Sequence, residues 1–318
     1  MANRALLIAG PTATGKSALG AAVATETSSG TSGGTSGEII NADSMQVYSD
    51  LEILSARPTA AQAAQVPHHL FAVKSADAAF SVADWHDRAA TCITDIWARE
   101  GLAIVVGGTG LYFRALLEGL APVPEIPDEI RAGLRTLLAE DGAAALHARL
   151  LEVDPAMAAR LNPGDGQRLA RALEVCLATG RSLAEWQQDT AAGALGEADR
   201  SGHVTKVVLT LPRDELYRRI EQRFDQMMEA GALDEVARLR DQGLAADLPA
   251  MKALGVPSLL AHLRGEMDLQ EAVQEAKTRT RRYAKRQMTW FRNQFADWHW
   301  LDADAEDLAA RLLAILSR

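Results

Sequence analysis

Residues 10–17 read GPTATGKS, and they follow a short apolar run, RALLIA, at residues 4–9. An apolar run that stops at a glycine and a proline is typical of a buried parallel strand. The alanine-rich stretch that begins at Lys16 and extends to about residue 25 predicts a helix. The pattern GxxxxGK[ST] between a strand and a helix indicates a phosphate-binding loop.

This loop has the chemistry that phosphate groups require. Its glycines let the backbone turn and aim several N–H groups at phosphate oxygens, and the N-terminus of the following helix adds positive potential. We expect Lys16 to neutralise terminal phosphate charge and the Ser17 hydroxyl to ligate Mg²⁺, the expected cofactor. The candidate residues for binding a diphosphate or nucleotide are Gly10, Pro11, Thr12, Ala13, Thr14, Gly15, Lys16 and Ser17. The motif alone does not name the reaction, because kinases, NTPases and other enzymes that handle a diphosphate share it.

Apolar runs and helical patterns alternate along most of the chain. The runs that predict strands lie at residues 4–9, 38–42, 69–73, 102–106, 203–211 and 298–301. The patterns that predict helices between and after them lie at residues 16–25, 81–99, 213–231, 233–242 and 269–295. Strands that alternate with helices imply a parallel sheet with helices on both faces. We therefore predict an α/β fold with a P-loop NTPase-like parallel sheet core.

A helical domain is predicted as an insertion in this core. Residues 121–127 carry three prolines and read as a linker, residues 128–189 are helical in pattern throughout, and residues 190–202 are small, polar and flexible in character. A stretch of only Ser, Thr and Gly at residues 27–37 reads as a flexible linker, natural or engineered. The predicted division is residues 1–120 and 201–318 for the core and residues 121–200 for the inserted helical domain.

Composition places the chain among soluble globular proteins of about two domains. Hydrophobic residues make up 48% of the 318 residues and charged residues 24%. No run approaches the ~20 apolar residues of a membrane span, and the phosphate-binding loop follows the first apolar stretch where a signal peptide would be cleaved. We expect a cytoplasmic protein without a membrane partner. The two cysteines, Cys92 and Cys176, exclude a disulfide framework and are expected to be small buried hydrophobes.

The charge of the chain is unevenly distributed. The net charge is −9, yet residues 277–292 read KTRTRRYAKRQMTWFR, with seven Lys or Arg and no acid. We call residues 277–292 the basic segment. A basic stripe on an acidic protein favours contact with nucleic acid. The alternative is a solvated charged helix face.

Two further segments follow predicted strands. NADSMQVY at residues 41–48 places Asp43 just beyond a strand, where ligands bind in open α/β sheets. That carboxylate can ligate a metal, act as a base or cap a helix. GGTGLYFRALLEG at residues 107–119 brings glycines that suit a close approach to a ligand, and Thr109 either contacts it or caps a helix.

Taken in order, these segments resemble the tRNA dimethylallyltransferase family (tRNA isopentenyltransferases). The resemblance covers nearly the whole chain. Besides the three segments above, it rests on Pro-His-His at 67–69, GDGQRLARALEV at 164–175, RIEQRFDQMMEAG at 219–231 and TRRYAKRQMTWFR at 280–292. No Cys/His zinc finger of the kind some eukaryotic relatives carry follows, so the chain resembles the bacterial type.

The resemblance implies transfer of a dimethylallyl group from dimethylallyl diphosphate to the exocyclic N6 amine of the adenosine 3′ to the anticodon in tRNA. It implies that the phosphate-binding loop and Mg²⁺ hold the diphosphate leaving group, and that Arg223 also grips it. Asp43 matches the family's general base, and Thr12 matches a position near the reacting centre. The expected partners are dimethylallyl diphosphate and the anticodon stem-loop of tRNA. No feature demands a dimer, so a monomer is expected.

The predicted tRNA contacts come from matched segments and from the basic segment. They are Asp43, Ser44, Met45, Gln46, Thr109, Arg131, Gln167, Arg168, Leu169, Ala170, Arg171, Lys252, Arg281, Arg282, Lys285, Arg286 and Gln287. The inserted domain is expected to close over the anticodon stem and loop. MKALGVPS at residues 251–258 departs from the more polar segment of many members, which leaves its contribution to tRNA contact open.

Two other functions share the phosphate-binding loop. The first is a small-molecule kinase that uses ATP, which gives no reason for the basic segment. The second is a noncatalytic RNA-binding protein in which a nucleotide acts as a switch, which leaves Asp43 without a chemical role. A transfer assay without ATP separates both from prenyl transfer.

Overall fold

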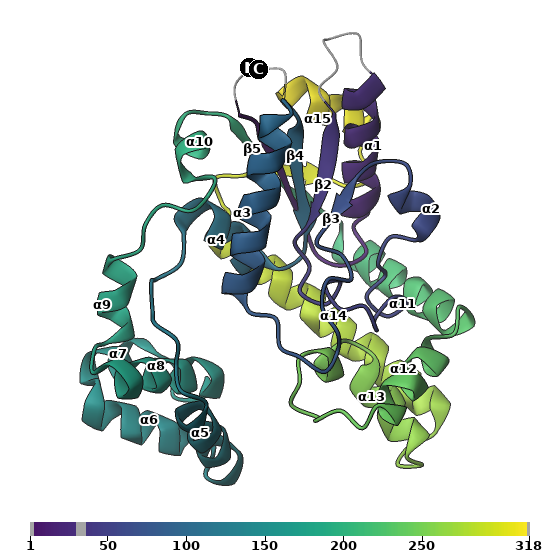
Figure 1. The fold of residues 1–318 in the computed structure, drawn as a ribbon. Helices are drawn as coiled ribbons and strands as arrows, with labels where there is room; N and C mark the ends of the chain where they lie inside the picture. The colour runs from purple at the N-terminus through teal and green to yellow at the C-terminus, as the bar shows by residue number, and fades with distance from the viewer. Residues whose placement is uncertain (1–2, 30–35, 317–318) are drawn as a thin grey trace. The chain divides into compact units, whose positions relative to one another are not determined.

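The computed structural model describes residues 3–29 and 36–316. Its centre is a six-stranded sheet with the order β3-β2-β4-β1-β5-β6 and parallel pairing throughout (Figure 1). The strands are β1 (Ala5–Ala9), β2 (Gly37–Asn41), β3 (His68–His69), β4 (Leu102–Gly107), β5 (Val204–Thr210) and β6 (His299–Asp302). The predicted α/β class with a parallel sheet is confirmed.

The central strands are apolar because both faces of the sheet are covered. Every residue of β1, β2 and β4 is buried, as expected for parallel strands between two helical layers. Along β1, Leu6 and Ile8 belong to one hydrophobic cluster with the helices α1 (Lys16–Ser29) and α15 (Leu308–Leu316). The other residues of β1, which are Ala5, Leu7 and Ala9, belong to a second cluster on the opposite face.

The sheet unit contains further helices. Besides α1 and α15 they are α2 (Ala60–Ala63), α3 (Val82–Ala98), α4 (Gly110–Glu118), α10 (Gly196–Arg200), α11 (Arg213–Glu229), α12 (Ala232–Asp241), the 3-10 helix η1 (Ala250–Lys252), α13 (Val256–Leu263) and α14 (Leu269–Gln294).

Cys92 and Cys176 are both free and half-buried. Within the described ranges, no helix is long and apolar enough to cross a membrane.

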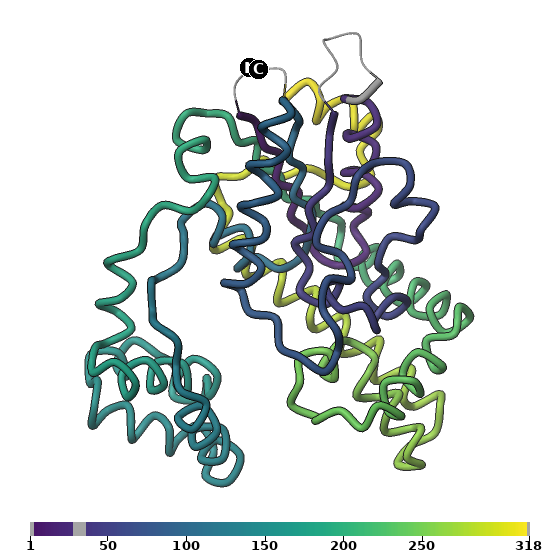
Figure 2. The backbone as a smooth tube through the Cα atoms, in the orientation of Figure 1, coloured from purple at the N-terminus to yellow at the C-terminus, as the bar shows by residue number. Residues whose placement is uncertain are grey.

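The strand register aligns the loops that carry the candidate residues. Ala9 of β1 pairs with Gly107 of β4 and with Val208 of β5. Strand β5 therefore lies beside β1 although the whole inserted unit separates them in sequence (Figure 2). Because parallel strands end at the same edge, the loops after β1, β2 and β4 meet there.

The strand predicted at residues 69–73 is wrong beyond His69. Leu70 and Ala72 adopt positive φ values of 64° and 52°, and a left-handed residue cannot continue an extended ladder. The carbonyl of Leu70 instead accepts the side-chain amide of Asn41 at 3.0 Å. The chain there leaves the sheet to support the loop after β2.

The chain divides into two compact units, residues 1–117 with 194–318, and residues 118–193. The second unit contains α5 (Asp128–Glu140), α6 (Gly142–Val153), α7 (Pro155–Arg160), α8 (Gly166–Thr179) and α9 (Leu183–Gln188). It has its own core, which includes Leu134, Leu150 and Leu173. The helices are separated by capped turns, since Asp154 caps α7 and Asp165 caps α8.

Two flexible stretches predicted from composition contain regular structure. Helix α10 lies within residues 190–202, where no element was predicted. In the Ser/Thr/Gly stretch at residues 27–37, α1 continues to its end at Ser29 and β2 begins at Gly37. Residues 30–35 of that stretch lie outside the described residues.

We predict that Gly107→Ala destabilises the sheet unit. A Cβ atom at Gly107 would lie 2.0 Å from the carbonyl oxygen of Ala42, so the ends of β2 and β4 would have to separate. The free energy of unfolding should fall by about 1–3 kcal/mol, as measured by urea denaturation. Gly133→Ala is the control, because nothing lies within 4 Å of a Cβ there, and alanine should stabilise the exposed helix by ~0.5–1 kcal/mol. Equal stability of both variants would contradict the prediction.

Candidate active site

The phosphate-binding loop leaves β1 and turns sharply into α1. Ala13 and Gly15 both adopt positive φ values, 67° and 78°, which cost a nonglycine residue about 1–2 kcal/mol. The Thr14 hydroxyl and the Lys16 ammonium donate to the carbonyl oxygen of Pro11 at 2.9 and 3.2 Å. The loop is therefore closed on itself, with the Lys16 side chain folded back over it. Ser17 is exposed on the first turn of α1.

Two cations, the buried Lys16 and the half-buried Arg223, interact with one carboxylate at this edge of the sheet. Burial lowers the pKa of Lys16 to about 8, while Asp43 opposes that shift and Arg223 adds to it. Burial also lowers the pKa of Arg223 on α11, again against the field of Asp43. The three groups come from the loop after β1, the loop after β2 and α11. Two partly desolvated cations beside one carboxylate favour an anionic ligand.

Asp43 is held by its own loop and by the loop after β4. Its N–H donates to Oδ1 of Asn41 at 2.8 Å, and its Oδ1 accepts the N–H of Met45 at 2.9 Å. The N–H of Ser44 donates to the Thr109 hydroxyl at 3.0 Å, and the N–H of Thr109 donates to Ala42. These bonds orient the Asp43 carboxylate and use its Oδ1.

A buried aromatic pair supports this loop. The indole N–H of Trp85 donates to the carbonyl of Asn41 at 2.7 Å, and the indole stacks on Tyr112 with ring centroids 4.1 Å apart. Burial, and then the charge of Asp43, raise the pKa of Tyr112 and of Tyr283 on α14. Both phenols therefore remain neutral beside the carboxylate at physiological pH.

Gln287 on α14 joins two loops of the site. Its Oε1 accepts the N–H of Thr12 at 3.1 Å, and its Nε2 donates to the carbonyl of Gly108 at 2.9 Å. The side chain is only 7% exposed. Gln46 is similarly occupied, since its Nε2 donates to the carbonyls of Ser55 and Ala56. Both amides were predicted to contact tRNA, and in the structure both bind the protein's own backbone.

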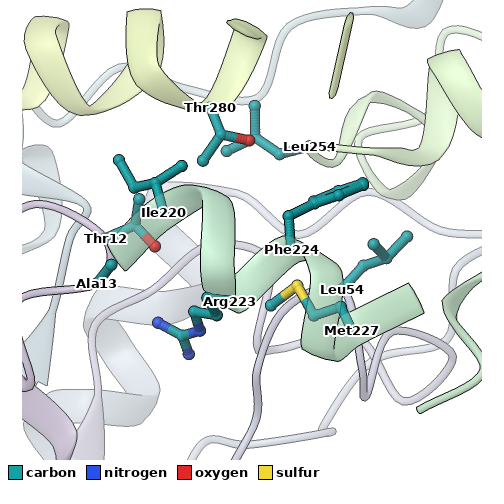
Figure 3. A pocket seen from close by; sticks show the side chains of 9 residues that line it. All are labelled: Thr12, Ala13, Leu54, Ile220, Arg223, Phe224, Met227, Leu254 and Thr280. Carbon is teal, nitrogen blue, oxygen red and sulfur yellow. The ribbon is translucent and has the colours of Figure 1, made fainter. Parts of the chain in front are cut away.

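An apolar pocket opens beside the phosphate-binding loop (Figure 3). It is lined by Thr12, Ala13, Leu54, Ile220, Arg223, Phe224, Met227, Leu254 and Thr280. The pocket is partly open, and its empty volume of about 360 Å³ includes open solvent. In Figure 3, Thr12 and Ala13 lie at one side of the pocket and Leu54 lies at the other, with Arg223 at the lower edge.

The basic segment is paired over only part of its length. Lys277 pairs with Asp225 at 2.6 Å, and Arg281 pairs with Glu221, both acids of α11. Arg279 pairs with Glu275 of its own helix. The cations that remain exposed, without an ion pair in the described part of the chain, are Arg282, Lys285, Arg286 and Arg292. They lie near one face of α14, at the spacing of successive helical turns.

The other predicted tRNA residues lie in two places. Lys252 is exposed in η1 of the sheet unit. Those of the second unit are Arg131 on α5 and Gln167, Arg168, Leu169, Ala170 and Arg171 on α8. Leu169 is fully buried in the core of that unit, so its side chain supports the helix from within. The arginines are at the surface, each near an acid three residues away.

Several residues of the site have no signal in the sequence. Leu54 and Leu254 reach the pocket from loops that carry no motif, and Asn41 reads as the end of a strand. No group of three or more His, Cys, Asp or Glu side chains that could hold a metal ion occurs among residues 3–29 and 36–316. A metal at this site would therefore take most of its ligands from a bound molecule and water.

Comparison with known proteins gives a consistent family. A protein-family model described as IPP transferase matches residues 46–294. A tRNA dimethylallyltransferase of Maricaulis maris is 50% identical over 98% of both chains. One of Rhodopseudomonas palustris is 50% identical over 95% of this chain and 92% of its own.

Solved structures agree with this assignment. The tRNA isopentenylpyrophosphate transferase of Bacillus halodurans is 35% identical, with a TM-score of 0.68 over 99% of this chain and 97% of its own. A eukaryotic dimethylallyltransferase, described as acting on tRNA, is 26% identical, with a TM-score of 0.79 over 98% of this chain and 78% of its own. The resemblance found in the sequence is confirmed, and the chain belongs to the IPP transferase family.

Proposed function

We propose that the chain transfers a dimethylallyl group from dimethylallyl diphosphate to the exocyclic N6 amine of the adenosine 3′ to the anticodon in tRNA. The observation that carries the proposal is the pocket in which Thr12 and Arg223 adjoin five apolar side chains. A diphosphate with a short hydrocarbon tail needs this combination of positive charge and apolar wall. The names of the relatives support the reaction class.

The diphosphate end of the donor is assigned to the phosphate-binding loop. Lys16 of this loop and Arg223 of α11 both interact with Asp43 and lie close enough for the charge of Arg223 to lower the pKa of Lys16. These groups would stabilise the charge that develops on the leaving diphosphate. The Ser17 hydroxyl is a hard oxygen ligand at the start of α1 and fits Mg²⁺ together with diphosphate oxygens. When bound, the ion would supply further neutralisation of the leaving group.

The prenyl tail is assigned to the apolar part of the pocket, which we call the donor pocket. Its walls are Leu54, Ile220, Phe224, Met227 and Leu254. Transfer of apolar surface from water onto these walls is favourable by about 25 cal/mol per Å². The same walls exclude water from the carbon that is attacked, which would limit hydrolysis of the donor.

Asp43 is proposed as the general base. As the adenine nitrogen forms a bond to the prenyl carbon, the carbon–oxygen bond to diphosphate breaks and Asp43 takes the proton that the amine loses. Its carboxylate is oriented by Asn41 and Met45. Thr12, at the border of the pocket, would contact the donor diphosphate or the reacting centre.

The tRNA is assigned to the exposed cations and to the helical unit. A base in the anticodon loop must leave its stack to reach a carboxylate in a pocket. Arg282, Lys285 and Arg286 would contact phosphates. We propose that Arg168 and Arg171 of the helical unit contact the anticodon stem-loop, and that one tRNA binds one chain in the cytoplasm.

The decisive experiment is prenyl transfer from labelled dimethylallyl diphosphate to an unmodified tRNA with adenosine 3′ of the anticodon, with Mg²⁺ and without ATP. Label in the tRNA is the expected result. Label-free tRNA that still binds the protein would instead favour a nucleotide-dependent RNA-binding protein. A kinase would turn over ATP in the absence of RNA.

We predict that Asp43→Asn lowers kcat by about 10²–10⁴-fold with little change in tRNA affinity. Asparagine keeps an oxygen for the N–H of Met45 but is not a base. Single-turnover transfer and filter binding measure the two quantities. Asp77→Asn, at an exposed position in the same part of the sequence, is the control. Full activity of Asp43→Asn would remove the general base from the proposal and leave the family assignment intact.

We predict that Arg282→Ala with Lys285→Ala flattens the salt dependence of tRNA binding. Each phosphate contact contributes roughly 0.7–0.9 to the slope of log affinity against log salt, so the slope should fall by about 1–2. The control is Arg240→Ala with Arg264→Ala, which removes the same charge from exposed positions on other helices. An unchanged slope would assign the two cations to a solvated face.

We predict that Gln287→Leu raises the donor KM or lowers kcat by about tenfold, because two buried backbone groups lose their partner. Affinity for tRNA should hold, since the amide binds Thr12 and Gly108 within the protein. Gln274→Leu, at an exposed position of the same helix, is the control. Loss of tRNA affinity with unchanged donor kinetics would contradict this prediction and support a tRNA contact at Gln287.

A further inference from the structure

A buried carboxylate outside the proposed machinery holds one wall of the donor pocket. Glu235 on α12 is 2% exposed. Its Oε2 accepts the N–H groups of Glu52 and Ile53 at 2.8 and 2.7 Å, and its Oε1 accepts the N–H of Leu54 at 3.0 Å. In the described part of the chain, Glu235 has no ion pair with a cation. Three backbone donors therefore compensate its buried charge.

These three donors belong to one tight turn. The N–H of Ala56 donates to Ile53 at 2.9 Å, and the N–H of Arg57 donates to Glu52 at 3.1 Å. The carbonyls of the turn are thus used within it, while its leading N–H groups point away from it, as at the start of a helix. Glu235 caps this turn from a helix about 180 residues further along the sequence.

Leu54 is the member of the turn that lines the donor pocket. Its opposite side is close-packed, since a Cβ at Gly255 would lie 2.9 Å from Cδ2 of Leu54 and 3.2 Å from Cε2 of Phe224. Leu54 therefore has backbone fixed by Glu235 and a side chain confined by α11 and the residue before α13. In Figure 3 it lies across the pocket from Thr12.

We propose that Glu235 is a positioning residue that sets the prenyl chain length accepted by the donor pocket, because it fixes Leu54 as the wall opposite the diphosphate. The inference rests on the proposed function. A longer prenyl chain displaces a wall that three hydrogen bonds hold in place less easily than it displaces a loop whose N–H groups bind only water. One additional group in an apolar pocket changes discrimination by roughly 10–200-fold, so the position of a single wall residue is sufficient.

The test compares kcat/KM for dimethylallyl diphosphate with kcat/KM for geranyl diphosphate, which is one isoprene unit longer. Glu235→Ala should raise the KM of the shorter donor, leave its kcat within about twofold, and lower the preference for it by roughly tenfold. Glu235→Gln keeps one acceptor oxygen and should give an intermediate preference. Asp234→Ala removes a neighbouring exposed acid of α12 and should behave as the unaltered chain.

The outcomes are distinct. A folded Glu235→Ala variant with the preference of the unaltered chain would overturn the inference, as would a loss confined to kcat for both donors. Should Glu235→Ala fail to fold, Leu54→Ala leaves the cap intact, and an unchanged preference in both Leu54→Ala and Glu235→Gln would overturn it equally. If the unaltered chain transfers neither donor to tRNA, the proposed function fails. If the inference about Glu235 alone is wrong, the unaltered chain still transfers the donor.

Discussion

The placement of two partly desolvated cations, the buried Lys16 and the half-buried Arg223, beside a single carboxylate is the constraint on which the site depends. Lys16 and Arg223 both have a pKa lowered by loss of solvent, which means that folding places them where their charge is costly. Asp43 offsets only part of that cost. An anion that enters beside them would offset the remaining cost, which is why we propose a diphosphate at this place.

Long-range hydrogen bonds from the C-terminal helices hold the loops that carry this charge. Gln287 fixes the phosphate-binding loop against the loop after β4, and Glu235 fixes the turn that contains Leu54. Each side chain makes hydrogen bonds to backbone groups of loops, which lie outside the regular backbone hydrogen bonding of the sheet and the helices. The helices after β5 therefore do more than cover the sheet, since they set the positions of loops that precede them by well over a hundred residues.

The sequence was sufficient for the local backbone of the candidate site. The structure has GPTATGKS between a strand and a helix and Asp43 just beyond a strand, as the local pattern predicts. It was not sufficient where tertiary contacts decide. Gln287 lies in a basic run and reads as a nucleic-acid contact, yet its amide is buried. Likewise Arg281 reads as unpaired until α11 brings Glu221 beside it.

One loop carries both the proposed base and the proposed wall of the donor pocket, and Gln46 joins its two parts. Gln46, three residues after Asp43, donates to the carbonyls of Ser55 and Ala56, directly after Leu54. The turn that carries Asp43 and the turn that carries Leu54 are thus joined within one loop, yet each has its own support, since Asn41 accepts the N–H of Asp43 and Glu235 accepts the N–H of Leu54. In the proposed reaction, alignment of the base and selection of the donor therefore depend on different hydrogen bonds of the same loop. A change in the wall can then alter the donor preference while the base stays in place.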